Sequence, residues 1–437
     1  MFASKKKVPH EIKAAALIHG TTRVTADKQI SLRALIMTAL SSGRSEIKNC
    51  FFSSDCERLI KILKKLGIRI KRNKDGDLDI TGRGRYGLRA PYGKIDCGGS
   101  DDVISIMAGI LVPQMFGSVL VADNDVTEMS MRKITLPLKR MGADISANKA
   151  EFPPLKIRPG LIKGTSLRTY LPGADVKTCL LFSALYSDET TTIAQQYMSH
   201  DHTERMMQYF GISVGSSGNT VSISGGANWP GKVVKVPGDF SVAAFLIAAA
   251  LLVKDSSIEI RDVGLNPTRT GFLNILRRMG ADIQVTQTEQ ICNEPVGTVK
   301  ASYTNELRPV ILDQDDIPEL MDEIPLIVLL ATRANGKTII EGVDAMRKNR
   351  SNRLHAISTQ LQNMGQSIEE QYDSLVITGG KGPLKRAKLK SFRDAEIAMM
   401  LTIAGLSAKD GIEIDSTACV EKSYPGFYGI LEGVIER

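Results

Sequence analysis

Residues 138–145 read LKRMGADI, and residues 276–283 repeat the phrase as LRRMGADI. Weaker copies are LKKLGIRI at 63–70, MQYFGISV at 207–214 and LQNMGQSI at 361–368. In each copy an amphipathic segment stops at a glycine, and an apolar segment follows. Glycine readily adopts the left-handed conformation that ends helices, so each phrase predicts a surface helix followed by a strand. Because the phrase recurs five times along the chain, it predicts a protein built from repeated structural units.

A second, more apolar helix is predicted before each phrase, and a sixth lies near residue 400. These segments are rich in alanine, glycine and serine and apolar all round, which predicts burial and close packing. They span residues 31–43, 101–112, 175–187, 240–253, 322–336 and 394–408. A short strand is predicted after each of them, at 45–52, 118–122, 191–195, 257–263, 337–343 and 411–415.

The six helices predict six units, but the sixth unit ends after its surface helix at 425–437. The strand-like segments 11–18 and 21–26 have no helix before them, so we expect them to complete the sixth unit. This predicts an α/β protein with two lobes of three units each, covering 26–239 and 1–25 plus 240–437. Because the chain would pass twice between the lobes, we expect hinge closure around a ligand.

The stretch 27–33, DKQISLR, places Lys28 and Arg33 at the start of the first buried helix. Asp27 suits an N-cap. A helix N-terminus attracts anions through its free N–H groups and dipole, and the two cations would strengthen that attraction. The alternative interpretation is a capped helix with ordinary surface charges.

Composition narrows the class of protein. The 437 residues carry a net charge of +8 with 43% hydrophobic and 24% charged residues, as in globular proteins. Dispersed basic residues and 5% aromatic content argue against nucleic-acid binding. The longest apolar run, 242–253, is too short to span a membrane, and the six cysteines form no C-x-x-C pair. We therefore expect a monomeric cytoplasmic protein without membrane contact, metal or disulfides.

The stretch 27–36, DKQISLRALI, resembles the DKSISHRALI opening of the EPSP synthases, the 5-enolpyruvylshikimate-3-phosphate synthase family. The similarity continues along nearly the whole chain, notably in SHDHTERM at 199–206 and VGLNPTRTGF at 263–272. The resemblance implies two lobes, each an inside-out α/β barrel of three units. It also implies a shikimate-pathway enolpyruvyl transfer, in which the hydroxyl of shikimate 3-phosphate adds to phosphoenolpyruvate and phosphate leaves. The implied partners are these two small anions, and no cofactor is required.

Carried over residue by residue, the resemblance gives six positions a role in this site. Lys28 would contact phosphoenolpyruvate and take part in catalysis, and Asp322 would be the general base for the shikimate hydroxyl. The other implied binding residues are Arg33 for shikimate, Ser199 for the substrate phosphate, and Arg353 and Lys422 for phosphoenolpyruvate.

Other positions depart from the family pattern. Asp101 and Asp102 replace the Gly-Thr of the family's phosphate-binding GNSGT loop. Ser105 stands where the family has the arginine that follows this loop. Arg132 is a candidate substitute for a lost cation. The remaining altered positions are Gln29 for serine, Met129 for the arginine of RPM, Asp175 for glutamine, Asn349 and Arg350 for the Lys-Glu of KESDR, and Glu396 for the arginine of DHR.

Three functions remain open from the sequence. The chain is an enolpyruvyl transferase of this type with compensating residues, a transferase with a different acceptor or donor, or a non-catalytic relative. Structural glycines and prolines do not distinguish these alternatives, because they serve turns and helix ends in each case.

Overall fold

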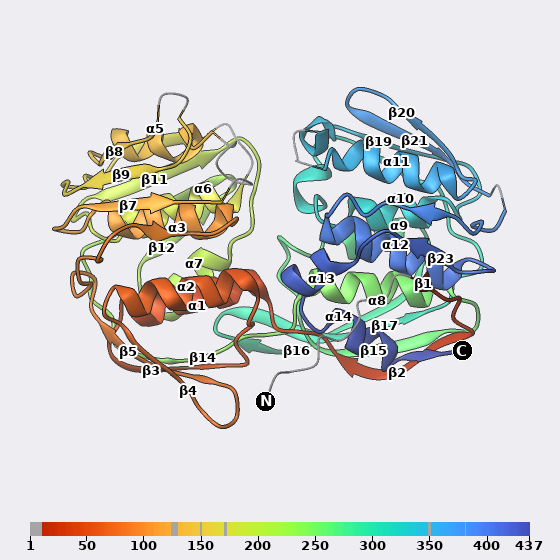
Figure 1. Cartoon of the computed structure of the whole chain (residues 1–437), viewed down its shortest axis with the longest axis horizontal. Helices are drawn as coiled ribbons and strands as arrows, with labels where there is room; N and C mark the ends of the chain where they lie inside the picture. Colours follow the sequence, from red (N-terminus) through yellow and green to blue (C-terminus); the bar gives the residue numbers. More distant parts are fainter. Residues whose placement is uncertain (1–10, 124–129, 149–150, 170–172, 348–350, 381) are drawn as a thin grey trace. The chain divides into compact units, whose positions relative to one another are not determined.

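The computed structural model describes residues 11–123, 130–148, 151–169, 173–347, 351–380 and 382–437. The chain divides into two compact units (Figure 1). The first unit comprises Ala26–Val236 and Gln290–Glu294. The second comprises Met1–Thr25, Pro237–Glu289 and Pro295–Arg437. Each unit encloses its own core of buried apolar side chains.

The six predicted buried helices are present, three in each unit. Their side chains are almost completely inaccessible, as expected for apolar sequences without a polar face. They are α1 (Lys28–Ala39), α3 (Asp101–Leu111) and α6 (Ala174–Ala184) in the first unit, and α8 (Phe240–Leu252), α10 (Ile324–Ala331) and α12 (Ala395–Ser407) in the second.

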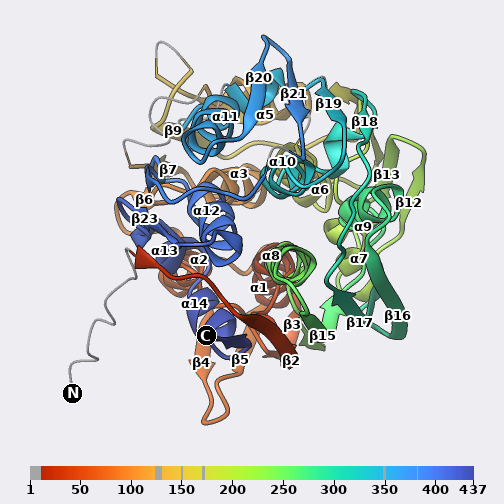
Figure 2. The same cartoon turned by 90° about the vertical axis from the view of Figure 1, so that its right-hand side faces the viewer.

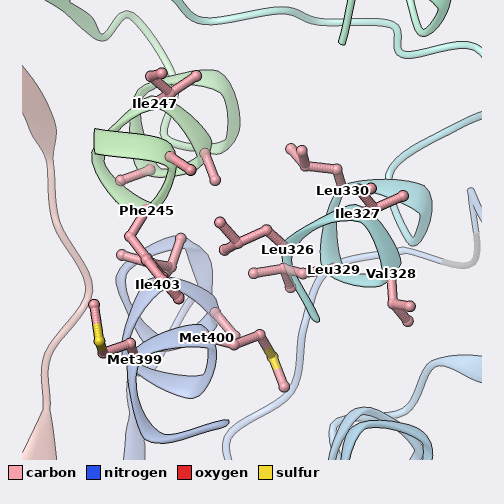
Figure 3. Packing of buried hydrophobic residues seen from close by; sticks show 14 of the residues in the cluster. Phe245, Ile247, Leu326, Ile327, Val328, Leu329, Leu330, Met399, Met400 and Ile403 are labelled. Carbon is pink, nitrogen blue, oxygen red and sulfur yellow. The ribbon is translucent and has the colours of Figure 1, made fainter. Parts of the chain in front are cut away.

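The buried helices pack closely through small residues and interlocking apolar side chains. Figure 3 shows Phe245 of α8 reaching toward Ile403 of α12, with Leu326 and Leu329 of α10 facing the same interior. In the first unit, α3 and α6 approach at Gly109, where an added Cβ would lie 2.3 Å from the carbonyl oxygen of Cys179. Only glycine permits this separation of the two helices.

Surface helices follow at the predicted places. The glycines that end the five repeated phrases all have positive φ, between 75° and 96°, which confirms the predicted helix stops. The surface helices are α2 (Ser54–Lys65), α5 (Arg132–Arg140), α7 (His202–Tyr209), α9 (Gly271–Arg278), α11 (Arg353–Asn363), α13 (Ala418–Ser423) and α14 (Phe427–Glu432). Two short 3₁₀ helices, η1 (Ile317–Glu319) and η2 (Asp344–Arg347), lie in the second unit.

In the described part of the first unit, three four-stranded sheets share one pattern, a parallel pair followed by two antiparallel neighbours. Their orders are β14-β3-β5-β4, β6-β7-β9-β8 and β10-β11-β13-β12. The strands are β3 (Ser42–Lys48), β4 (Arg69–Arg72), β5 (Leu78–Arg83), β6 (Ile95–Asp96), β7 (Ser118–Val121), β8 (Asp144–Ser146), β9 (Leu155–Arg158), β10 (Ser166–Thr169), β11 (Thr190–Gln195), β12 (Val214–Ser217), β13 (Thr220–Ser224) and β14 (Val233–Lys235).

The second unit repeats this pattern in the sheet β18-β19-β21-β20 and varies it in β16-β17-β15-β2-β24 and β1-β23-β22. Its strands are β1 (Glu11–Ile12), β2 (Leu17–Arg23), β15 (Ser257–Gly264), β16 (Asp282–Ile291), β17 (Glu294–Ser302), β18 (Ile311–Leu312), β19 (Lys337–Glu341), β20 (Ser367–Glu370), β21 (Ser374–Thr378), β22 (Lys388–Leu389), β23 (Ile412–Ile414) and β24 (Ile435–Glu436).

The first residues of the described chain belong to the second unit. Strand β1 pairs antiparallel with β23, and β2 pairs parallel with β15 (Figure 2). One detail differs from a simple sixth repeat. Strand β24, which follows the last surface helix, pairs with β2 rather than with the sheet that contains β23. The segment 11–18, which was expected to form one strand, is divided between two sheets, because β1 pairs in one and β2 in the other.

The hairpin β16–β17 gives a second difference from the expected division. Its tip, Gln290–Glu294, groups with the first unit, although the sequence division places it with the second lobe. At the tip, Glu294 accepts a hydrogen bond at 2.8 Å from Nδ1 of His202, and both side chains are buried. The repeat pattern carries no signal for this buried polar tip, which joins the mostly exposed β16 to the mostly buried β17.

Candidate substrate site

The start of α1 is capped and carries a partly buried cation. The carboxylate of Asp27 accepts from the Ile30 N–H at 2.8 Å, which confirms the predicted N-cap. Lys28 places its Nζ 3.5 Å from the carboxylate of Asp55 and 3.8 Å from that of Asp102. Gln29 donates to the same Asp102 carboxylate at 2.8 Å. Two carboxylates therefore already balance the charge of Lys28.

Arg33 turns into the interior of the first unit. Its guanidinium group donates to the hydroxyls of Thr203 and Thr178 at 2.8 and 2.7 Å and to Oε1 of Gln29 at 2.7 Å. The side chain is 1% exposed, and this burial lowers the pKa of Arg33. The sequence resemblance assigns Arg33 to the shikimate ligand, but here its donors join α1, α6 and α7.

A second cation, Lys133, lies between two carboxylates. Its Nζ contacts Asp101 of α3 and lies 2.7 Å from Oδ2 of Asp175 of α6. Burial opposes the charge of Lys133, but Asp175 and Asp101 prevail and raise its pKa. Burial raises the pKa of Asp101 to about 6, so its carboxylate is still ionised at neutral pH. The three side chains form an internal ion cluster.

Lys133 was not identified as a site residue from the sequence, and the adjacent Arg132 was named instead. Arg132, the candidate substitute for a lost cation, is exposed on α5, whereas Lys133 is directed to the acidic pair. Asp101 and Asp175 are partly buried and both contact Lys133, but their proximity arises only in the fold, so no local sequence pattern signals this cation. Ser105, which stands at an altered arginine position, is fully buried within α3.

Ser199 lies beside a buried ion pair. Its hydroxyl donates to Oε1 of Gln195 at 2.9 Å, and its backbone carbonyl accepts from Lys177 Nζ at 3.0 Å. The same ammonium group lies 2.6 Å from Oε1 of Glu204, and both side chains are at most 5% exposed. Lys177 and Glu204 therefore position the loop that carries Ser199.

In the second unit, Arg353 is held by two acidic side chains. Its Nε donates to Asp394 at 2.7 Å and its Nη2 to Glu396 at 2.6 Å. Tyr424 donates its hydroxyl to the other oxygen of Glu396 at 3.2 Å. The carboxylates of Glu396 and Asp394 raise the pKa of Arg353 against the opposing effect of burial. Burial raises the pKa of Glu396 to about 7.

Asp322 takes part in a second set of hydrogen bonds in the same unit, and its charge also acts on Arg353 and Glu396. Arg269 donates to Asp322 at 2.9 Å and also to the hydroxyl of Ser241, which donates to Glu323 at 2.7 Å. Burial raises the pKa of Glu323 to about 8. Asp322 itself keeps 38% of its side chain exposed. The sequence motifs that contain Arg269 and Glu323 were recognised, but neither residue was assigned a role.

The remaining candidates are distributed as follows. Lys422 is exposed on α13. Met129, Asn349 and Arg350 lie outside the described residues. Within the described ranges, no group of three or more His, Cys, Asp or Glu side chains could hold a metal ion. No helix of the described chain is long and apolar enough to cross a bilayer.

Comparison with known proteins places this geometry in a family. Residues 12–431 match the family model described as EPSP synthase (3-phosphoshikimate 1-carboxyvinyltransferase). The chain belongs to the EPSP synthase family. Its relatives include the 3-phosphoshikimate 1-carboxyvinyltransferases of Brevibacillus brevis and Geobacillus kaustophilus, at 36% and 37% identity. Each alignment covers 96% of this chain and 98% of the relative.

Solved structures agree with this membership. An EPSP synthase of Acinetobacter baumannii superposes with a TM-score of 0.89 at 29% identity, covering 97% of both chains. The enolpyruvyl transferase NikO of Streptomyces tendae has a TM-score of 0.77 at 16% identity over 98% of both chains, a likeness of fold. The predicted two-lobed inside-out α/β barrel is thereby confirmed.

Three of the ion-paired acids, Asp101, Asp175 and Glu396, stand at positions where the sequence resemblance expects other residues. Each of these carboxylates contacts a cation of its own unit, either Lys133 or Arg353.

Proposed function

We propose that this chain is a non-transferring member of the EPSP synthase family, one that does not move the enolpyruvyl group for which its relatives are named. One observation carries the proposal. In each unit a cation suited to a small anionic substrate, Lys133 or Arg353, is bound on two sides by carboxylates of the chain. These internal carboxylates would compete with the anionic groups of a substrate for the same cations.

The loss of positive charge determines how much the affinity for phosphoenolpyruvate should fall. Phosphoenolpyruvate carries a phosphate and a carboxylate, which bind through charge-assisted hydrogen bonds to arginine and lysine. Truncating one partner of a buried charge pair costs roughly 2–5 kcal/mol. Serine at position 105 and glutamate at position 396 remove two arginines of the family pattern. Their loss alone should weaken phosphoenolpyruvate binding by at least ~10³-fold.

A direct assay tests this function. Shikimate 3-phosphate and phosphoenolpyruvate are mixed with the purified chain at millimolar concentration, and phosphate release is followed by a coupled reaction. We expect no release above the enzyme-free control, because carboxylates of the chain already pair with Lys133 and Arg353. Phosphate release that requires the chain and both substrates together would refute the proposal.

A restoring variant makes the test sharper. Ala395→His with Glu396→Arg returns the family's His-Arg pair and releases Arg353 from one carboxylate. We expect calorimetry to show phosphoenolpyruvate binding at least tenfold tighter than in the unchanged chain. A matched control is Glu413→Arg, the same charge reversal at a half-exposed strand position, which should not change the affinity. Circular dichroism checks that each variant folds.

A second candidate is transfer with another acceptor or donor. It is favoured by Asp322, whose partly exposed carboxylate is oriented by Arg269 as a general base would be. A thermal-shift screen of phosphorylated and carboxylated metabolites distinguishes it, because a bound ligand raises the melting temperature. A stabilising ligand that is converted in the presence of the chain, and not by Asp322→Asn, would establish this alternative.

A further inference from the structure

The net positive charge of the chain is concentrated in residues 61–94 of the first unit. This segment holds eleven Lys and Arg residues against three Asp, a net charge of +8. The whole chain also has a net charge of +8, so the remaining residues balance to zero. Chain-wide averages, which argue against nucleic-acid binding, therefore do not represent this segment.

None of these eleven cations is neutralised by a carboxylate of the chain. Within the described ranges they form no ion pair, and ten of them are exposed. The other one, Arg85, is buried and donates to the carbonyls of Leu185 and Gly226. A single surface cation is merely solvated, but ten of them on one segment produce a positive field that attracts polyanions.

Hydrogen bonds bring the charged parts of the segment together. These parts are the last turn of α2, strand β4 directly after it, and the loop 84–94. The N–H of Arg89 donates to the carbonyl of Leu66 at 2.8 Å, and Lys65 Nζ donates to the carbonyl of Lys94 at 2.6 Å. The loop thus covers the end of α2, and the exposed cations of 61–94 form one surface, the basic surface.

The repeat shows that the fold does not require this charge. At the position of Arg69 in LKKLGIRI, the phrases LKRMGADI and LRRMGADI have Asp144 and Asp282, and the other two copies have serine. Asp144 lies 3.8 Å from the guanidinium group of Arg158 on the neighbouring strand. The first copy therefore has a basic residue where the same structural position is elsewhere acidic or neutral.

Two tyrosines are exposed on the loop of the basic surface. Tyr92 is 96% exposed and Tyr86 is 57% exposed, whereas every Leu and Ile of 61–94 is buried. A lipid surface is bound by exposed aliphatic or tryptophan side chains next to cations, and this segment exposes none. Aromatic rings among Lys and Arg are instead typical of sites for single-stranded nucleic acid, where bases stack on the rings and phosphates contact the cations.

We propose that the basic surface binds single-stranded nucleic acid. Lys and Arg side chains of α2, β4 and the loop 84–94 contact the phosphates, and Tyr92 stacks on a base. None of these residues is among the positions that the family resemblance assigns. The binding is therefore independent of enolpyruvyl transfer and of its proposed loss.

Fluorescence anisotropy with a fluorescein-labelled oligouridylate of about twelve nucleotides tests the site on the full chain. We expect a dissociation constant of about 1–100 μM at about 0.15 M salt, and weaker binding as salt rises, because phosphate contacts release counter-ions. The triple variant Lys64→Gln, Arg69→Gln and Lys94→Gln removes one cation from each part of the surface. It should weaken binding at least about tenfold and reduce the slope of log affinity against log salt by about 2.

Tyr92→Ala separates base stacking from charge. It should weaken binding about tenfold, the effect of losing one stacked base, and leave the salt slope unchanged. Tyr372→Ala is the control, because Tyr372 is 78% exposed in the second unit, and this variant should bind like the unchanged chain. Equal losses of affinity in the two tyrosine variants would refute the stacking role of Tyr92.

Lys254→Gln, Lys337→Gln and Lys409→Gln together are the control for charge. These lysines are exposed in the second unit, so the variant loses the same charge and keeps the basic surface. It should bind the oligonucleotide within about twofold of the unchanged chain. Circular dichroism checks that each variant folds.

Three results would overturn the proposal. The first is no binding of the oligonucleotide at about 100 μM chain, and the second is an equal loss of affinity in both triple variants. The third is tighter binding of polyglutamate or of phosphatidylserine vesicles than of the oligonucleotide, which would make an acidic protein or a membrane the partner of this surface.

Discussion

Glu396 is one of the residues whose charge changes near neutral pH. It accepts from Arg353 and Tyr424, and burial raises its pKa to about 7. A carboxyl group with a raised pKa stabilises the folded state below its ordinary pKa of 4.5, and this contribution is lost as the pH rises through about 7. Ionisation of Glu396 therefore costs stability even though Arg353 lies beside it.

The variant Glu396→Gln should be insensitive to this ionisation. Between pH 5 and pH 8, we expect its free energy of unfolding to rise relative to the unchanged chain by about 2 kcal/mol. Urea denaturation at the two pH values measures the difference. Glu432→Gln, a substitution of an exposed glutamate paired with Arg437, is the control. A difference between Glu396→Gln and the unchanged chain that does not vary with pH would contradict the prediction.

Single residues of the site were predictable where the local sequence determines their geometry. The N-cap of Asp27 follows from its position before an apolar helix, and the structure confirms it. The counter-ions were not predictable, because Lys133 meets Asp101 and Asp175 across 32 and 42 residues of sequence. Such pairings depend on how three separate helices pack together. Hydrophobic periodicity predicts each helix but not which helices become neighbours.

At the scale of elements, the contact between α3 and α6 leaves no room for a side chain at Gly109. Besides the close approach at Gly109, the hydroxyl of Ser183 donates to the Gly109 carbonyl at 2.8 Å. Gly109→Ala would place a methyl group against the backbone of α6. Because the backbone cannot yield without moving the helix, we expect a loss of about 1–3 kcal/mol in the free energy of unfolding.

Gly429→Ala is the matched control for this prediction. Gly429 also lies within a helix, α14, but no atom would lie within 4 Å of its added Cβ. Alanine favours helix more than glycine, so this variant should be unchanged or more stable by up to about 1 kcal/mol. Urea denaturation compares the two. Equal effects of both substitutions would show that helix propensity, not the close approach of α3 and α6, decides the result.

The elements themselves were largely predictable, and the reason is their repetition. The helix–glycine–strand pattern occurs five times, so a chance glycine or alanine in one copy does not change the prediction. Strand β24 was not predictable, since two residues, Ile435 and Glu436, carry no periodicity. Its pairing with β2 depends on the direction of the chain after the last surface helix, α14, ends.

At the scale of the molecule, the two ends of the described chain stabilise one sheet. Ala16 donates its N–H to the carbonyl of Glu436 at 2.8 Å, and His19 donates to that of Val434 at 2.9 Å. Deleting residues 435–437 removes β24. We expect faster amide hydrogen exchange in β2, and unchanged exchange in β3 of the first unit, since β3 pairs with β5 and β14.

Arg437→Gln serves as the control for the deletion. It removes the ion pair with Glu432 but leaves β24 in place, so exchange in β2 should stay as it was. Faster exchange in β2 and β3 alike after the deletion would mean that the two units open together, contrary to the prediction from their separate cores.

The pairing of β1 with β23 and of β2 with β15 and β24 has a consequence for biosynthesis. Residues 11–23 leave the ribosome before their partner strands, which are translated later, at 257–264, 412–414 and 435–436. The first unit, apart from Gln290–Glu294, is available for folding in the meantime. During that interval β1 and β2 remain an unpaired strand edge, the kind of segment that chaperones bind and that aggregates when they are absent. The second unit therefore cannot complete its sheets until the last strands of the described chain have been made.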